Sequence, residues 1–226
     1  ANNHSAVQFV YCGHRITDEK PALKGLPATF APKGEVMTLE LDVADPVLGL
    51  EATLFYSVFE KEDVITRSIT VKNSSEDTIY LTKIMSLSLD MDQEDYRMLT
   101  LHGSWARERQ MDFRSIGYGK QNVGSTRGES SHQEHPFVAL VSEKATQESG
   151  CVYGFHFVYS GNFLAQVEKS QFDSLRVQMG IHPDNFCYQL CPGDSFVAPE
   201  VVMTYSANGL GQMSRNLHDL YREHLI

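Results

Sequence analysis

The single tryptophan of the chain, Trp105, lies in a polar stretch with His102 on one side and Arg107 and Arg109 on the other. An indole face offers apolar, polarisable area to the CH-rich face of a sugar ring, and nearby polar side chains can bind the ring hydroxyls. The stretch is therefore compatible with a carbohydrate contact at Trp105. A core or loop-anchoring tryptophan fits the same residues and ranks slightly ahead, and surface salt bridges explain His102 and the arginines equally well.

No other segment has the spacing of a catalytic or phosphate-binding motif. The chain contains no GxSxG nucleophile elbow, no HExxH zinc helix, no Walker loop and no dinucleotide fingerprint followed by a helix. Acidic residues fall mostly in turn-like segments, so no complete catalytic carboxylate pair is predicted. Ser130, Ser131, His132 and Gln133 are adjacent in the chain, and adjacent residues rarely face one another. We expect no catalytic residue and no cofactor in this chain.

The four cysteines, Cys12, Cys151, Cys187 and Cys191, are too sparse for a disulfide scaffold and favour a reduced compartment. Cys187 and Cys191 are separated by three residues, a spacing that occurs in some zinc sites, but the chain has no paired CxxC. Buried thiols and no metal site are therefore expected.

Composition and charge exclude several classes of partner. The chain has 226 residues, 42% of them hydrophobic and 21% charged, which is ordinary for a folded protein. Its net charge is -10, and no stripe of Lys or Arg could neutralise phosphates, so neither nucleic acid nor an anionic membrane is an expected partner. No apolar run reaches membrane-spanning length, and the first residues do not resemble a signal peptide. A cytoplasmic location is expected, unless an upstream signal has been removed.

Short runs of alternating apolar and polar residues, bounded by Gly, Pro, Asn or Asp, predict an all-β protein of many antiparallel strands. Charged residues 60–63 separate runs 50–60 and 64–73, which predicts a hairpin. Turn residues 73–77 predict a third strand that extends this hairpin into a meander. The remaining predicted strands span residues 7–12, 36–42, 79–89, 97–102, 137–142, 151–159, 163–169, 174–179, 185–190 and 196–205.

Residues 208–226 alone show a convincing helical period, with apolar side chains three or four positions apart from Leu210 to Leu225. Asn208 or Ser206 could cap the start of this helix. The helix either packs its apolar stripe on the sheet or leads into a further domain. We expect one domain over residues 1–226.

Residues 103–136 form a predicted long irregular stretch, because they contain few aliphatic residues and four glycines between Gly117 and Gly128. Structureless segments of this length are usually functional or disordered. The aromatic residues and the histidines His132 and His135 argue against disorder. The sequence therefore places the candidate functional region here.

Several ordered motifs carry a resemblance. The run LHGSWARER at residues 101–109 is followed by GKQNVGSTRGESSHQ, from Gly119 to Gln133, and by PF at 136–137. Later runs are GFHFVYSGNFLA at 154–165, VQMGI at 177–181 and LHDLYR at 217–222. From about residue 80 to the end, the chain resembles the N-terminal domain of bacterial glycoside hydrolase family 36 α-galactosidases, and residues 7–70 agree in strand pattern.

This resemblance implies a β-supersandwich of two large antiparallel sheets with a C-terminal connecting helix, incomplete at its N-terminus. It implies a retaining α-galactosidase acting on oligosaccharides such as raffinose and melibiose, whose two catalytic aspartates belong to a (β/α)8 barrel absent from this chain. Trp105 is then expected to approach the galactose site at the mouth of that barrel. A homotetramer, with this domain taking part in subunit contacts, is also implied. The resemblance assigns no role to the loop from Gly119 to Gln133.

Two other functions stay open. A free-standing carbohydrate-binding or assembly module would have the same strand pattern without any hydrolytic partner. A zinc-dependent β-sandwich would use Cys187, Cys191 and nearby histidines, and it would contain stoichiometric metal. The resemblance favours the α-galactosidase.

Overall fold

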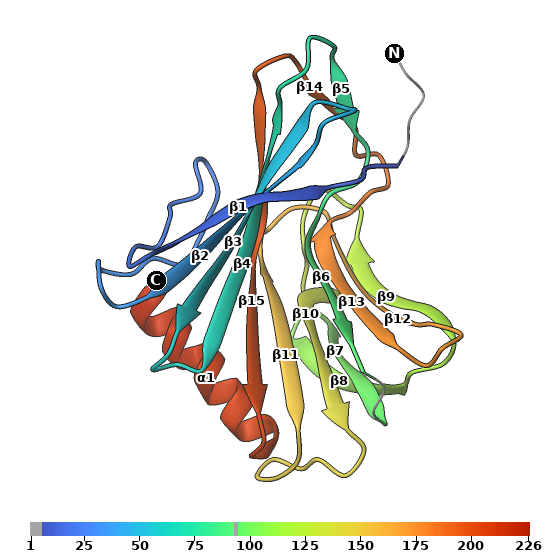
Figure 1. The fold of residues 1–226 in the computed structure, drawn as a ribbon. Coiled ribbons are helices and arrows are strands. Elements are labelled where there is room, and N and C mark those ends of the chain that lie inside the picture. The colour runs from blue at the N-terminus through green and yellow to red at the C-terminus, as the bar shows by residue number, and fades with distance from the viewer. Residues whose placement is uncertain (1–5, 93–94) are drawn as a thin grey trace.

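The computed structural model describes residues 6–92 and 95–226, and this part of the chain contains fifteen strands and one helix (Figure 1). Nine antiparallel strands form a large, strongly curved sheet. In spatial order these are β1 (Val10–Thr17), β2 (Met37–Asp45), β3 (Leu50–Phe59), β4 (Val64–Asn73), β15 (Ser195–Ser206), β11 (Val152–Val158), β10 (Glu134–Ser142), β7 (Tyr96–Ser104) and β8 (Arg107–Ser115).

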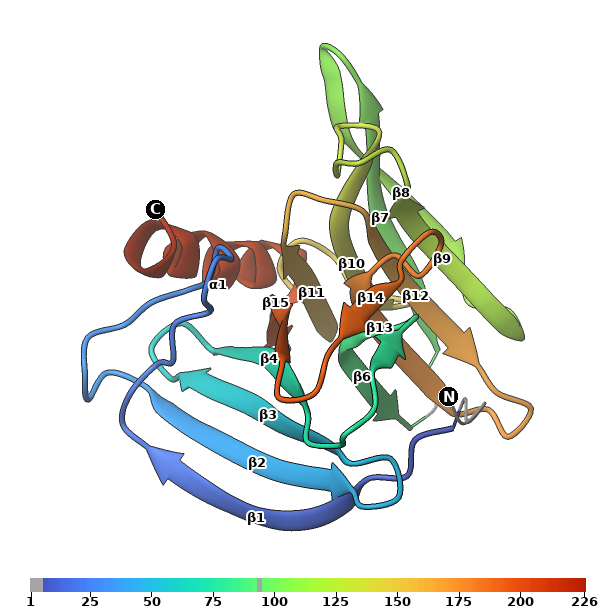
Figure 2. The same cartoon turned by 90° about the horizontal axis from the view of Figure 1, so that it is seen from above.

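A smaller antiparallel sheet faces one half of the large sheet. It contains β12 (Phe163–Lys169), β13 (Leu175–Ile181) and β6 (Met85–Met91), and β9 (Gly119–Ser125) runs alongside β12. A two-stranded ribbon pairs β5 (Ile79–Leu81) with β14 (Tyr188–Leu190). The helix α1 (Gly209–His224) lies on the opposite side of the large sheet from β6, β12 and β13 (Figure 2). Antiparallel sheets packed face to face, with one C-terminal helix, confirm the predicted all-β class.

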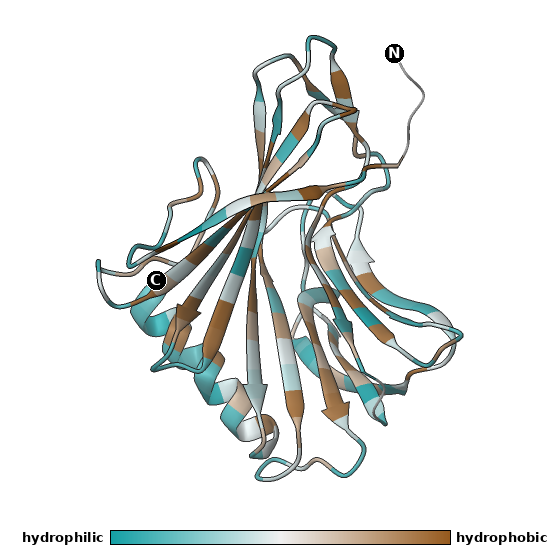
Figure 3. Ribbon diagram, in the orientation of Figure 1, coloured by the Kyte–Doolittle hydropathy of each residue, from teal (hydrophilic) through white to brown (hydrophobic). Residues whose placement is uncertain are grey.

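Strand alternation explains the two largest of three hydrophobic clusters, which lie on opposite sides of the large sheet. In β10, Val138 and Leu140 face the smaller sheet, while Ala139 and Val141 face α1. This strand is buried on both sides, so its sequence is almost continuously apolar (Figure 3). The core between the sheets includes Met98, Phe155, Phe157, Phe163, Val167, Val177 and Met179. The core under the helix includes Leu99, Val152, Val202, Leu210, Met213, Leu217 and Leu220.

The predicted hairpin is confirmed, but the predicted meander is wrong. β3 and β4 pair from Leu50–Asn73 to Phe59–Val64, and residues 60–63 form the turn. The next strand does not pair with β4, because β15 from the far end of the chain occupies that edge. The predicted strand 79–89 is also divided, since β5 pairs with β14 and β6 pairs with β13 in a different sheet. Local turn residues cannot reveal which distant strand competes for an edge.

Two strands lie at the ends of the large sheet, and both were mispredicted. The stretch 103–136 is not irregular, because it contains β8, β9 and the start of β10. The first strand was expected at residues 7–12 but spans Val10–Thr17. Most residues of β1 and β8 are exposed, so neither strand carries the apolar alternation on which strand prediction depends.

The predicted C-terminal helix is confirmed as α1, and its apolar stripe packs on the sheet. Asn208 occupies the N-cap position, but its side chain makes no capping hydrogen bond, and Ser206 Oγ instead accepts from the Asn208 backbone N–H. The first helical N–H groups are satisfied by the loop between β10 and β11: Leu210 N donates to Thr146 O at 3.0 Å and Gly211 N to Gln147 O at 2.9 Å. A tertiary contact thus replaces the expected side-chain cap.

The thiols differ from expectation as well. All four cysteines are free, but Cys12 and Cys187 are exposed and Cys151 and Cys191 are half-buried, so they are not the buried thiols predicted.

In the described residues, α1 is too short and too polar to cross a membrane.

Candidate functional site

Trp105 lies at the tip of the hairpin formed by β7 and β8. Ser104 pairs with Arg107, so Trp105 and Ala106 form the turn, and Ala106 adopts a left-handed φ of 61°. The hairpin extends away from the two sheets (Figure 2), and the Trp105 side chain is 84% exposed. This exposure excludes the core tryptophan that the sequence left open. The hairpin therefore leaves the apolar indole open to contact from outside the domain.

The polar residues near Trp105 do not converge on it. His102 lies in β7 with Nδ1 2.8 Å from Glu134 Oε2, although the two atoms are not aligned as a hydrogen bond. Its Nε2 lies 2.6 Å from Thr100 Oγ1 and 3.0 Å from an Arg114 guanidinium nitrogen. The His102 ring therefore makes its polar contacts with Thr100, Arg114 and Glu134. Arg107 is exposed next to the turn.

Arg109 adopts a left-handed φ of 56° and lines a cavity on the helix side of the large sheet. The cavity is about 450 Å³ and lies between α1 and strands β7, β8, β10 and β11. Its polar lining includes His135, His156 and Tyr221. Its apolar lining is Leu99, Leu101, Met111, Phe137, Leu210, Met213 and Leu217.

Three of these polar side chains form a connected group. The rings of His135 and His156 stack with centroids 5.5 Å apart, and the Tyr221 hydroxyl lies 2.7 Å from His156 Nδ1. The sequence does not predict this group, because His156 and Tyr221 are 65 residues apart. The one available signal was a histidine flanked by the buried Phe155 and Phe157 in a central strand.

Burial determines the protonation of this group. Burial, reinforced by His135 and Arg109, lowers the pKa of His156 to about 3. Burial and the Arg109 charge lower the pKa of His135 to about 4. Burial also raises the pKa of Tyr221, so its hydroxyl stays protonated and shares a hydrogen bond with the neutral His156 Nδ1. At neutral pH the three side chains are uncharged, with a hydrogen bond between Tyr221 and His156 and the His135 ring stacked on His156.

We expect acid to destabilise the chain through His156. Its folded pKa of about 3 lies below the ordinary 6.5, so the unfolded state binds more protons and stability falls as the pH drops below 6.5. One such histidine costs about 2 kcal/mol between pH 7 and pH 5. His156→Gln should reduce the loss measured by urea unfolding by about this amount, while the exposed-site control His132→Gln should not. An equal loss in wild type and His156→Gln would contradict this assignment.

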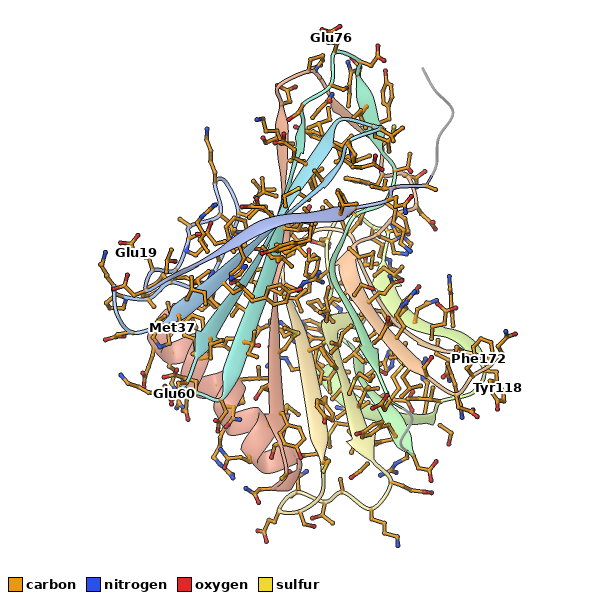
Figure 4. All side chains as sticks on the ribbon, viewed as in Figure 1. Glu19, Met37, Glu60, Glu76, Tyr118 and Phe172 are labelled. Atoms are coloured by element: carbon orange, nitrogen blue, oxygen red, sulfur yellow. The ribbon has the colours of Figure 1, made fainter. Side chains whose placement is uncertain are left out.

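The segment from Gly119 to Gln133 begins as β9, which packs closely on β12. A Cβ at Gly124 would lie 2.5 Å from Phe163 O, so this glycine serves strand packing. Ser130 Oγ donates to Tyr159 O at 3.5 Å, and Ser131 Oγ accepts from Gln133 N at 3.2 Å. These bonds are structural and provide no serine–histidine pair. Figure 4 shows the start of this region, where Tyr118 lies beside the turn of Phe172.

The cysteines of the zinc hypothesis do not gather ligands in the described residues. Cys187 is exposed, and Cys191 Sγ accepts from Gln189 Nε2 at 3.6 Å. Within residues 6–92 and 95–226, the group of three ligand side chains within metal-binding distance is Glu62, Glu223 and His224, which contains neither cysteine.

Comparison with known sequences agrees with the resemblance. Residues 1–191 match the Glycosyl hydrolase family 36 N-terminal domain. The chain is 47% identical over 225 residues to alpha-galactosidase AgaA of Geobacillus stearothermophilus, a match that covers 99% of this chain and 31% of the relative. It is 42% identical over 226 residues to alpha-galactosidase 2 of Hypocrea jecorina, covering 100% of this chain and 30% of that protein.

Solved structures give the same result. The crystal structure of Geobacillus AgaA superposes with a TM-score of 0.97, covering 99% of this chain and 31% of that one. The α-galactosidase of Lactobacillus brevis has a TM-score of 0.97 at 35% identity, covering 100% of this chain and 31% of that one. Variants of AgaA have been crystallised with stachyose and with raffinose. This chain spans under a third of these relatives, and it belongs to glycosyl hydrolase family 36, whose N-terminal domain it represents.

Proposed function

We propose that this chain is the non-catalytic N-terminal domain of a retaining α-galactosidase that hydrolyses terminal α-D-galactosyl residues of oligosaccharides such as raffinose and melibiose. The observation that carries this proposal is the match of residues 1–191 to the family 36 N-terminal domain, together with 47% identity to an α-galactosidase over 225 residues. Complexes of the Geobacillus enzyme with raffinose and stachyose support this substrate class.

The proposal divides the work between two parts of the enzyme. A retaining glycosidase needs two carboxyl groups about 5–5.5 Å apart across the glycosidic bond, one as nucleophile and one as acid/base. We assign both to aspartates of a (β/α)8 barrel that this chain lacks. Trp105 contributes to the rim of that site, where its indole packs against the apolar face of the sugar and excludes water from the bond that breaks.

A second role is assembly, in which the domain contacts its own barrel and other subunits of a homotetramer. On the concave side of the large sheet, Val58, Ile65 and Tyr205 remain 41%, 40% and 45% exposed and line a groove of about 710 Å³. Exposed apolar surface of this kind is typical of a protein interface. A cytoplasmic location completes the proposal, and the four free thiols support a reducing compartment.

The test is an assay of this chain and its full-length parent on a chromogenic α-galactoside and on raffinose. We expect the parent to release galactose and the chain alone to be inactive, because it lacks the two carboxylates. Activity in the isolated chain would contradict the division of work. An inactive parent, together with calorimetric binding of raffinose by the isolated chain, would favour the free-standing carbohydrate-binding module.

A further inference from the structure

A buried histidine and two glutamates come together far from the Trp105 hairpin. Glu62 lies in the turn between β3 and β4, whose first residue, Glu60, is labelled in Figure 4, and Glu223 and His224 end α1. One ligand atom from each of the three lies within 4.8 Å of the others. Glu62 and His224 are 7% and 5% exposed, while Glu223 is exposed. The group joins the end of the helix to the sheet beneath it.

Contacts with Phe30 and Phe59 fix the orientation of the His224 ring. Nδ1 lies 3.0 Å from the backbone oxygen of Phe30, and a carbonyl oxygen can only accept, so Nδ1 carries the hydrogen. The Phe30 N–H in turn donates to the His224 carbonyl at 2.8 Å, and the Phe59 ring packs 4.9 Å from the imidazole. Held in this way, the imidazole directs Nε2 toward Glu62. Histidines that bind metals are oriented by the same bond from the other ring nitrogen to a backbone carbonyl.

Glu62 is a buried carboxylate whose oxygens have no hydrogen-bond donor among the described residues. Its Oε1 lies 3.5 Å from His224 Nε2, which exceeds the 2.7–3.2 Å of an N–H···O hydrogen bond. Two ligands held about 2.0–2.2 Å from one tetrahedral ion are separated by about 3.3–3.6 Å. The observed separation therefore suits a shared cation better than a shared proton.

We propose that Glu62, Glu223 and His224 bind a divalent transition-metal ion, with Zn²⁺ as the best fit. One imidazole nitrogen and two carboxylate oxygens are ligands that Zn²⁺ accepts, and solvent beside the exposed Glu223 can supply the fourth. The ion would brace the last turn of α1 against the turn between β3 and β4. The site is independent of the proposed glycosidase function.

The test is calorimetric titration of ZnCl₂ into chelator-treated protein, with thermal unfolding in parallel. We expect one Zn²⁺ per chain at this site and a higher Tm with zinc present. Glu62→Gln and His224→Gln should lower the affinity at least 10- to 100-fold. Glu223→Gln changes an exposed side chain, so it should weaken binding without disturbing the fold. The control Glu148→Gln, on an exposed loop, should bind like wild type.

Co²⁺ provides a second readout, because its visible spectrum distinguishes nitrogen and oxygen ligands from thiolates. We expect a spectrum without thiolate bands that disappears in Glu62→Gln. Absence of Zn²⁺ binding would overturn the proposal and leave a protonated His224 paired with Glu62. If Glu62→Gln and Glu223→Gln bound Zn²⁺ as tightly as wild type, the proposal would be wrong. A Co²⁺ spectrum with thiolate bands would also overturn the proposal and would indicate binding by the exposed cysteines.

Discussion

Glu200→Ala is expected to lower the free energy of unfolding by about 3–5 kcal/mol. Glu200 lies in β15 and is 1% exposed, and its Oε1 is 2.6 Å from Lys20 Nζ. Its Oε2 accepts from the Thr29 backbone N–H at 2.8 Å and from Thr29 Oγ1 at 2.9 Å. Both charges are buried, so removing the carboxylate leaves the Lys20 ammonium and the Thr29 donors without a partner. The segment between β1 and β2 would then lose its polar contacts with β15.

Urea unfolding of wild type and Glu200→Ala measures this cost. The matched control is Asp90→Ala, which removes the Arg176 ion pair between two side chains that are 51% and 64% exposed and should cost at most about 1 kcal/mol. Adding Lys20→Met to Glu200→Gln should cost less than the sum of the single changes, because the second substitution removes the uncompensated charge. A loss below about 1 kcal/mol in Glu200→Ala would show that Lys20 reaches water and that the pair contributes little.

Some elements followed directly from the sequence because one local pattern sufficed. The hairpin of β3 and β4 has regular alternation and a charged turn, and α1 has a helical apolar stripe. The edge strand β8 could not be found this way, because its only apolar residues are Met111 and Phe113 and both are exposed. What forms β8 is pairing with β7 rather than burial of its own side chains.

The candidate site shows the same limit. The sequence identified Trp105 but could not decide between a buried and an exposed indole, since that depends on a hairpin whose second strand has no clear pattern. The cluster of His135, His156 and Tyr221 forms because β10, β11 and α1 meet around one cavity. The contact of His224 with Glu62 forms because the end of α1 lies against the turn before β4. These contacts join segments that are far apart in the sequence, so no periodic pattern of residues predicts them.

The most direct measurement is kcat/KM of the full-length enzyme carrying Trp105→Ala. We expect a loss of about 10- to 100-fold on raffinose, which corresponds to about 1.4–2.7 kcal/mol of transition-state stabilisation. The Tm should stay unchanged, because the side chain is 84% exposed in this domain. Trp105→Phe should keep part of the activity, since a smaller aromatic face remains.

Tyr118→Ala is the matched control, because it removes another exposed aromatic side chain, 71% exposed, from a loop outside the Trp105 hairpin. It should leave kcat/KM unchanged. A specific loss in Trp105→Ala, with normal folding and normal activity of Tyr118→Ala, is the result that this account predicts. Unchanged kcat/KM in Trp105→Ala would contradict it and would leave the hairpin a role in assembly alone.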